Sequence, residues 1–361
     1  NNMADNYNTQ RPILTDVQQI DESTIELNWE CDTTGILGYR IYGSANGKTW
    51  NMGIDENECQ DTSIQIPFTG GALYFRVASV NGDLTESNWS NVLGIGLYNS
   101  EKTCLIVDGF TRESGSWRGA GHTFVYKYGN SIESLQEEIN FISVKNSKLV
   151  DSSFDLQDYD YVLWILGDES TSDETFGYEE QVLVKDYLEN GGNLFVTGSE
   201  IGWDLDYKGD QQDKDFYHQY LKANYVADDA GTNKATGVAS SSLDGCSIFF
   251  SQTYDEDYAD EVEPINGSAL CMRYENVNKI GAGIEYAGAF GASSEIGKLI
   301  YLGFPLETAA NDTSFNEIIS SAIQFFNNVV SVEADNNIII SAFNLEQNYP
   351  NPFNPSTTIS Y

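Results

Sequence analysis

Acidic and small polar residues follow four short apolar runs of the sequence, and their side chains could do acid–base or nucleophilic chemistry. The runs span residues 105–107, 161–166, 194–196 and 299–302. The residues that follow them are Asp108 and Arg112, then Asp168 and Glu169, then Ser199 and Glu200, and finally Glu307. Because the carboxyl ends of parallel strands share one edge of a sheet, we expect these seven side chains to converge in one cleft.

Two kinds of catalysis fit these residues, and so does binding without catalysis. A serine nucleophile at Ser199 needs a base, and of the two histidines in the chain we prefer His122. Alternatively, the pair Asp168 and Glu200 could act as acid and base on a glycosidic bond, with Glu169 close behind. A binding surface would instead use polar groups beside exposed tryptophans, and its candidates are Asp108, Arg112, Trp117, Trp203 and Glu307.

A calcium loop is a further hypothesis. Its acidic residues are Asp204, Asp206, Asp210, Asp213 and Asp215. Their spacing approaches that of a calcium-binding loop followed by a helix. Lys208 stands where an oxygen ligand belongs, however, and Asp215 replaces the usual glutamate. The alternative is an acidic loop that caps a helix starting near Asp213. Ca²⁺ is the only cofactor that the sequence suggests.

The elements that must position these residues fall into two classes. Residues 11–98 contain short runs of alternating apolar residues, which predict an antiparallel β-sandwich. Residues 101–330 alternate fully apolar runs with helical patterns, which predict a doubly wound, mainly parallel α/β sheet. The predicted helices span residues 131–142, 178–188, 213–221 and 315–326.

The first part resembles a fibronectin type III domain. The resemblance lies in Trp29, in the stretch 38–43 followed by Trp50, in the strand 75–81, and in residues 86–90. It implies a sandwich that acts as a spacer or a binding module.

The second part resembles the class I glutamine-amidotransferase-like (flavodoxin-like) superfold. Ser199 or Glu200 stands in the turn where active members of that superfamily place cysteine, which removes amidotransferase chemistry. Stretches 107–110, 164–171, 196–206 and 301–305 also resemble a module of exported Bacteroidetes-type proteins. Those proteins are often labelled xanthan lyase or N-acetylmuramoyl-alanine amidase, and such an activity is expected in another part of the parent protein.

The last residues resemble an export signal. Residues 331–342 are predicted to be a linker, and residues 343–361 resemble the start of the β-sandwich sorting domain of the type IX (Por) secretion system. The resemblance rests on three prolines around Asn351 and Phe353, followed by Ser-Thr-Thr-Ile. It implies the type IX machinery as a partner, export through the periplasm, and an extracellular or outer-membrane-surface location.

Composition limits the partners. The formal net charge of −37 excludes nucleic acid as a natural partner, because phosphate backbones are repelled. No run of about 18 apolar residues occurs, so no membrane insertion is expected. Five cysteines permit bridges Cys31–Cys59 and Cys246–Cys271, with Cys104 as a buried thiol.

The sequence therefore predicts an exported, non-catalytic binding or scaffolding module of a larger protein that acts on glycan or cell-wall material. Polysaccharide or peptidoglycan is the expected ligand, and other domains of the parent protein are expected partners. One alternative is a hydrolase, either an amidase, an esterase or a glycan-degrading enzyme, that uses the cleft at the strand ends. A second alternative is a subunit of an extracellular assembly.

Overall fold

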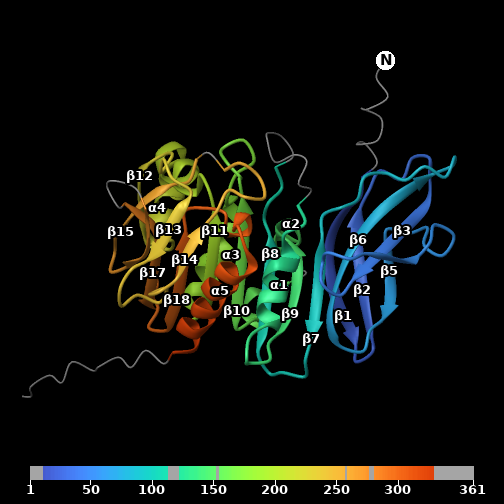
Figure 1. The fold of residues 1–361 in the computed structure, drawn as a ribbon, viewed down its shortest axis with the longest axis horizontal. Helices are drawn as coiled ribbons and strands as arrows, with labels where there is room; N and C mark the ends of the chain where they lie inside the picture. Colours follow the sequence, from blue (N-terminus) through green and yellow to red (C-terminus); the bar gives the residue numbers. More distant parts are fainter. Residues whose placement is uncertain (1–10, 113–121, 152–153, 257, 276–279, 329–361) are drawn as a thin grey trace, which may run out of the picture. The chain divides into compact units, whose positions relative to one another are not determined.

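The described part of the chain is mostly β-structure, with a large mixed sheet and few helices (Figure 1). The computed structural model describes residues 11–112, 122–151, 154–256, 258–275 and 280–328. The chain divides into two units, 1–328 and 329–361, and all described residues belong to the first. The predicted linker and sorting segment, together with Trp117, lie outside the described residues.

The N-terminal part is a sandwich of two antiparallel sheets. One sheet contains β1 (Ile13–Asp21), β2 (Thr24–Glu30) and β5 (Ser63–Pro67). The other contains β4 (Asn51–Ile54), β3 (Ile36–Ser44), β6 (Gly71–Asn81) and β7 (Leu93–Leu97). Alternate residues of β2 face the core, where Trp29 packs edge-on against Tyr39 with ring centroids 5.2 Å apart. This strand arrangement is fibronectin type III-like, as the sequence predicts.

The second part is built on a parallel sheet. Its strands lie side by side in the order β9 (Asn140–Lys145), β8 (Thr103–Asp108), β10 (Tyr161–Gly167), β11 (Asn193–Gly198) and β18 (Ile296–Leu302). Order reverses between β8 and β10, and the carboxyl ends of strands around such a reversal are where doubly wound sheets bind ligands.

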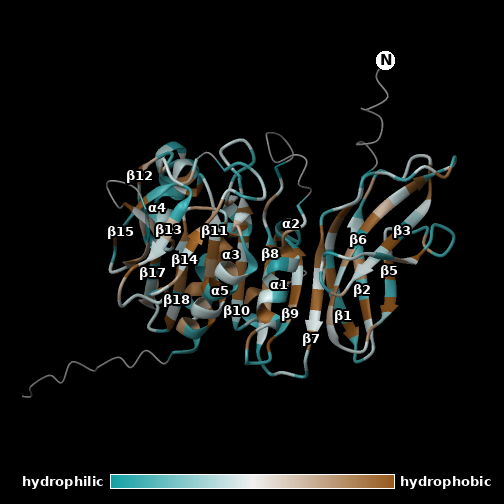
Figure 2. Ribbon diagram, in the orientation of Figure 1, coloured by the Kyte–Doolittle hydropathy of each residue, from teal (hydrophilic) through white to brown (hydrophobic). Residues whose placement is uncertain are grey.

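Helices cover both faces of this sheet, which explains why its strands are apolar runs without alternation. Ile106 of β8 shares a core with α1 (Val125–Glu133) and α5 (Asp312–Asn327). The next residue, Val107, shares a second core with α3 (Tyr178–Glu189) and α4 (Gln211–Gln219). Figure 2 shows hydrophobic residues concentrated along the strands and hydrophilic residues in the loops.

An antiparallel extension completes the mixed sheet, and the sequence analysis does not predict it. Its strands are β12 (Ala223–Ala227), β13 (Lys234–Gly237), β14 (Ser247–Phe249), β15 (Glu261–Pro264), β16 (Ala269–Tyr274) and β17 (Gly281–Ala289). β17 pairs with β18 in antiparallel fashion and so joins the extension to the parallel strands. The remaining short elements are α2 (Asn146–Val150), two 3₁₀ turns at Leu156–Asp158 and Leu306–Thr308, and a π-helical turn at Trp203–Lys208.

Two of the predicted helices need correction. The helix predicted over 131–142 is wrong, because α1 ends at Glu133 and β9 occupies residues 140–145. Phe141 and Val144 of β9 pack into the two different cores, which requires strand geometry. The helix predicted over 213–221 begins earlier, since the Asp210 side chain accepts the N–H groups of Gln212 and Asp213 and caps α4.

The two bridges that the sequence permits are not formed in the structure, where none of the five cysteines is joined to another. Cys31 and Cys59 each direct Sγ toward a backbone carbonyl, of Asp32 and Asp61 respectively, at 3.5 Å. Cys246 Sγ lies 3.6 Å from the Ser321 hydroxyl, and Cys271 is wholly buried in β16. Cys104 is fully buried in β8, as predicted. Among the described residues, no helix is both long enough and apolar enough to cross a membrane.

A buried polar junction joins the sandwich to the parallel sheet. β7 and β1 both pair with β9. The Asn91 side chain accepts the Leu14 N–H at 2.8 Å and donates to Leu14 O and to Asp108 Oδ2 at 3.0 and 3.1 Å. Lys145 Nζ lies 3.6 Å from the same Asp108 oxygen. Asp108, which the sequence analysis assigns to ligand binding, is therefore a buried junction residue.

We predict that Asn91→Ala lowers the free energy of unfolding by about 2 kcal/mol, because it leaves buried donors and acceptors of Leu14 and Asp108 without their partner. Urea unfolding followed by intrinsic fluorescence measures this. Asn57→Ala, at an exposed loop position, is the matched control and should change the free energy of unfolding by less than about 0.5 kcal/mol. Equal effects of the two variants would refute the role of the junction.

Candidate functional site

Arg112 organises the edge of the sheet at the ends of β8, β10 and β11. Its Nη1 lies 2.7 Å from the carbonyl oxygen of Asp168, 3.8 Å from the Asp168 carboxylate and 4.0 Å from Glu200 Oε2. Its Nε lies 3.4 Å from the carboxylate of Asp173. The structure thus brings Asp168 and Glu200 together, as the sequence predicts, with an arginine between them.

Ser199 and His122, the predicted nucleophile and base, each have a hydrogen-bond partner elsewhere in the structure. The Ser199 hydroxyl is wholly buried and donates to Asp168 Oδ1 at 3.1 Å. His122 Nε2 lies 2.8 Å from the carbonyl oxygen of Arg112, and its ring stacks on Phe110 at 4.6 Å. Burial lowers the pKa of His122 to about 4. Each side chain thus has a hydrogen-bond partner other than the one predicted, and a serine nucleophile activated by His122 stays a prediction.

Glu200 occupies a strained turn directly after β11. Its φ of +53° is rare for a residue with a Cβ, and such strain is concentrated at functional sites. Burial raises the pKa of Glu200, and the nearby carboxylates of Asp168 and Asp228 raise it further, while hydrogen bonding from Ser170 and the charge of Arg112 oppose them. Glu200 thus combines a left-handed backbone conformation with a carboxyl group of raised pKa.

Asp260 is a buried carboxyl beside this turn. It is wholly buried, and its Oδ2 accepts the N–H of Gly202 at 2.5 Å. Its Oδ1 has no hydrogen-bond partner among the described residues. Burial raises the pKa of Asp260 well above its usual value, and Asp228 and Glu200 add to the shift. Sequence reasoning missed Asp260 and Asp228 because they flank β15 and β12, strands of the extension that it did not predict.

Three aromatic rings form a cluster next to these carboxyl groups. Trp203 and Tyr207 stack with centroids 4.6 Å apart, and Tyr225 lies 6.3 Å and 5.9 Å from them. Tyr207 is 58% exposed, and Trp203 and Tyr225 are half-buried. We call Trp203, Tyr207 and Tyr225 the aromatic cluster. Lys208 Nζ lies over the Trp203 ring at 4.6 Å and over the Tyr207 ring at 5.0 Å.

A π-helical turn, Trp203–Lys208, carries Trp203 and Tyr207, and such turns are frequent at functional sites. Tyr225 lies in β12. Charges of Asp260, Asp228, Tyr207 and Glu200 all act on the Tyr225 hydroxyl, whose pKa is raised first by burial and then by them. The aromatic cluster and the carboxyl groups therefore share one neighbourhood.

Glu169 and Glu307 are buried supports and not accessible groups. Glu169 Oε1 accepts the Thr111 and Arg112 backbone N–H groups, the latter at 2.7 Å, and its pKa is raised to about 7 by burial. Glu307 accepts the Tyr254 hydroxyl at 2.7 Å and the Tyr128 hydroxyl at 3.3 Å on the α1 side of the sheet, and burial raises its pKa to about 7 also. Both are fully buried, whereas the sequence analysis assigns Glu169 to catalysis and Glu307 to ligand binding.

The five aspartates of the predicted calcium loop do not form a loop site. The segment that carries the first two is the π-helical turn. Asp204 accepts two hydrogen bonds from Thr175, Asp206 contacts His218 at 2.9 Å, and Asp210 caps α4. Asp213 accepts the Asp210 N–H at 2.9 Å and Asp215 accepts from Gln211 at 2.9 Å. The described residues contain no group of three or more His, Cys, Asp or Glu side chains that could hold a metal ion.

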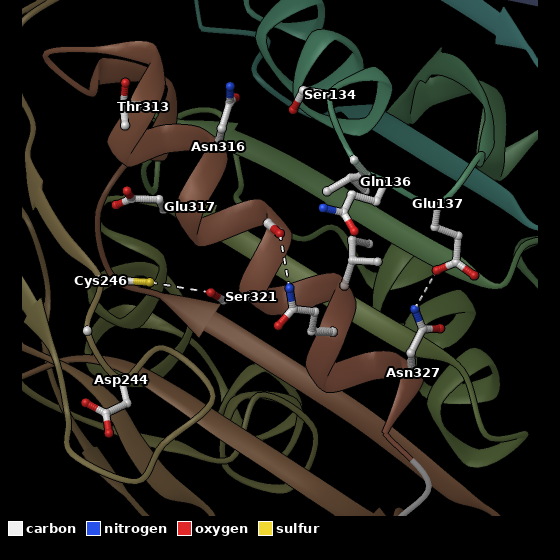
Figure 3. A pocket seen from close by; sticks show the side chains of 15 residues that line it. Ser134, Gln136, Glu137, Asp244, Cys246, Thr313, Asn316, Glu317, Ser321 and Asn327 are labelled. Carbon is white, nitrogen blue, oxygen red and sulfur yellow. Dashed lines mark hydrogen bonds between the residues drawn. The ribbon is translucent and has the colours of Figure 1, made fainter.

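Two cavities lie outside this neighbourhood. One of about 470 Å³ lies beside Asp204, Lys208 and Tyr178. A second, of about 840 Å³, is a polar groove along α5 (Figure 3). There the Asn327 amide donates to Glu137 at 2.9 Å, and Glu317 and Gln324 are exposed to solvent. Most side chains that line the groove are polar, and they come from none of the four strand-end loops, so we do not assign it the function.

Comparisons with known proteins give short, weak similarities. No protein-family model matches the chain, and no curated protein matches it. The chain is similar to a beta-1,2-glucanase from Parabacteroides distasonis, with 26% identity and a TM-score of 0.22, over 25% of this chain and 12% of that one. It is also similar to an Fn3-like protein from Clostridium thermocellum, with 21% identity and a TM-score of 0.20, over 22% of this chain and 84% of that one.

A third similarity is to the sixth fibronectin type III domain of human fibronectin type III domain containing protein 3. There the identity is 14% and the TM-score 0.22, over 30% of this chain and 93% of that one. At TM-scores this low, these similarities assign no activity to the chain.

We predict that Glu169→Gln flattens the decline of stability with pH between about 4.5 and 7. A carboxyl whose pKa is raised in the folded state binds more protons folded than unfolded in this window, so its contribution is complete below about 4.5 and lost as pH rises through about 7. Glutamine mimics the protonated form. Urea unfolding at several pH values measures the slope, with the exposed Glu179→Gln as control. An unchanged slope in Glu169→Gln would contradict the assignment.

Proposed function

We propose that the edge of the sheet around Glu200 and the aromatic cluster binds glycan without cleaving it. The single observation that carries the proposal is the exposed Tyr207 ring, stacked on Trp203 beside partly accessible carboxylates. Sugar rings combine a face of C–H groups with a periphery of hydroxyls. An exposed aromatic ring can pack on the C–H face of a sugar, and carboxylates can accept hydrogen bonds from its hydroxyl groups.

Accessibility of the carboxylates supports direct contact with hydroxyl groups. The side chains of Glu200 and Asp168 are each 12% exposed, and that of Asp173 is 25% exposed. Arg112 holds these three in fixed positions, so little side-chain freedom is lost on binding. The site therefore offers a preorganised set of acceptors next to an apolar platform.

Binding is favoured over hydrolysis by the state of the polar groups. Ser199 already donates its hydroxyl proton to Asp168, and the carboxylates of Asp168 and Glu200 both lie against Arg112. One observation favours the second candidate, a hydrolase in which Glu200 is the acid: its raised pKa and its φ of +53° are properties of catalytic groups. Product release distinguishes the two candidates.

The setting proposed for this binding site is outside the cell. Residues 343–361 resemble the start of a type IX sorting domain, which supports export by that machinery to the extracellular space or the outer-membrane surface. The sandwich would then act as a spacer that carries the binding part away from other domains of a larger parent protein. An alternative is that the acidic chain is one subunit of an extracellular assembly.

We predict that Tyr207→Ala weakens binding to the preferred polysaccharide about tenfold, because stacking on an aromatic ring contributes about 1.4 kcal/mol. Affinity electrophoresis and isothermal titration calorimetry against a panel of soluble glycans and peptidoglycan fragments measure the loss. Phe249→Ala removes an aromatic ring that is 41% exposed on a different strand and is the control. Equal losses in both variants, or no glycan binding by the native chain, would refute the proposal.

Reducing-end and ester or amide product assays decide between binding and catalysis. The binding proposal requires no product from any glycan that the native chain binds. Product that disappears in Glu200→Gln would establish the hydrolase instead.

A further inference from the structure

A cavity of about 470 Å³ lies against the π-helical turn that carries Trp203 and Tyr207 of the aromatic cluster. Lys208 of the same turn lines this cavity, and its Nζ lies over the Trp203 ring at 4.6 Å and over the Tyr207 ring at 5.0 Å. The aromatic cluster and the cavity therefore share one side chain. The volume of the cavity is within the range of about 300–1,000 Å³ that is typical of ligand pockets.

An exposed aromatic ring lines the cavity. Tyr178, the first residue of α3, is 58% exposed, which is also the exposed fraction of Tyr207. No aromatic side chain among the described residues is more exposed than these two. An exposed ring beside a cavity is a surface on which the C–H face of a sugar can pack. The two most exposed rings of the described chain thus lie on the two sides of Lys208, one at the cavity and one in the aromatic cluster.

Polar side chains line most of the remaining cavity. They are those of Thr171, Glu174, Asp204, Asp210, Gln212 and Asp213. Hydrogen bonds hold three of these carboxylates in place: Asp204 accepts the Thr175 N–H at 2.9 Å, Asp213 accepts the Asp210 N–H at 2.9 Å, and Asp210 accepts the Asp213 N–H at 3.2 Å. An ionised carboxylate can accept about four hydrogen bonds, so each retains capacity for a ligand hydroxyl group. The cavity therefore offers fixed acceptors, which lose little freedom on binding.

The charge of the cavity restricts the class of glycan. Lys208 carries the only positive charge among the described residues that line it, against four carboxylates. Polymers of uronic acids carry a carboxylate on each sugar unit and would be repelled by this wall. A neutral glycan meets no such repulsion, and its hydroxyl groups are the donors that carboxylates accept.

We propose that the cavity is a second sugar subsite, so that the binding site takes a neutral glycan chain of several sugar units. One unit would pack on Tyr207 and another on Tyr178, with hydroxyl groups directed toward the carboxylates of the cavity. This inference rests on the proposed function, since it names the length and charge of the ligand for the same site.

The test measures affinity against ligand length on the full 361-residue chain. The probes for isothermal titration calorimetry are the disaccharide and the hexasaccharide of β-1,4-linked glucose, and those of β-1,4-linked N-acetylglucosamine. In at least one series we expect the hexasaccharide to bind about tenfold more tightly than the disaccharide, because only the longer chain reaches both rings.

Variants then assign this advantage to the cavity. Tyr178→Ala should bring the affinity for the hexasaccharide down to that for the disaccharide, whereas Tyr207→Ala should weaken the binding of both. Val182→Ala changes another exposed residue of α3, which does not line the cavity, and is the matched control. It should change neither affinity.

Each other outcome overturns a specific claim. Equal affinities for the short and the long chain, or an advantage that survives Tyr178→Ala, would refute the second subsite while leaving glycan binding intact. Equal losses for both chains in Tyr178→Ala would also contradict it, because the cavity would then be the primary sugar site. Binding of neither series, or tighter binding of hexagalacturonate, would overturn the assignment to these neutral chains. Binding of no glycan at all would refute the proposed function itself.

Discussion

Parallel pairing of β8, β10, β11 and β18 is the constraint on which the site depends. Because these strands run in one direction, the residues that follow them are delivered to one edge, although they are far apart in the sequence. Arg112 after β8, Asp168 after β10 and Glu200 after β11 meet there within 4.0 Å contacts. The buried apolar strands thereby fix the positions of the polar groups that follow them.

Glycine makes two close approaches at this edge possible. Gly167 has a φ of +57°, and a Cβ there would lie 2.4 Å from the Phe110 ring. Gly202 follows the strained Glu200, and a Cβ there would lie 2.6 Å from the Tyr217 hydroxyl and 3.1 Å from Asp260 Oδ2. The short bond from Gly202 N–H to Asp260 needs that approach. The segment that carries Glu200, Trp203 and Tyr207 is thus held in place by the buried carboxyl group of Asp260.

The sequence was most informative where one physical requirement dominated. Strands buried on both faces must be apolar throughout, so β8, β10, β11 and β18 could be predicted, and amphipathic periodicity predicted α3 and α5. The sequence predicts a helix where β9 lies, because apolar residues around β9 fit both the helical repeat of 3.6 residues and the strand repeat of two. The structure decides for a strand, since residues of β9 pack into two different cores. The extension β12–β17 has short, weakly patterned strands, so Asp228 and Asp260 could not be placed.

The partners of the predicted site residues could not be derived from the sequence where those partners come from distant segments. Ser199 and His122 are compatible as nucleophile and base by residue type. In the structure, Ser199 hydrogen-bonds to Asp168, and His122 hydrogen-bonds to the carbonyl oxygen of Arg112. Asp108 lies at the predicted edge of the sheet, where its carboxylate accepts a hydrogen bond from the Asn91 side chain of the sandwich. The predicted pair of Asp168 and Glu200 is brought together because both follow central strands and share Arg112.

The most direct test of the account is amide hydrogen exchange, measured by mass spectrometry with and without a saturating concentration of the soluble glycan that the chain binds best in the panel. The account predicts new protection confined to peptides around residues 167–174, 199–208 and 225–230. Protection confined to the sandwich or to the groove along α5, with no change around Glu200, would contradict it.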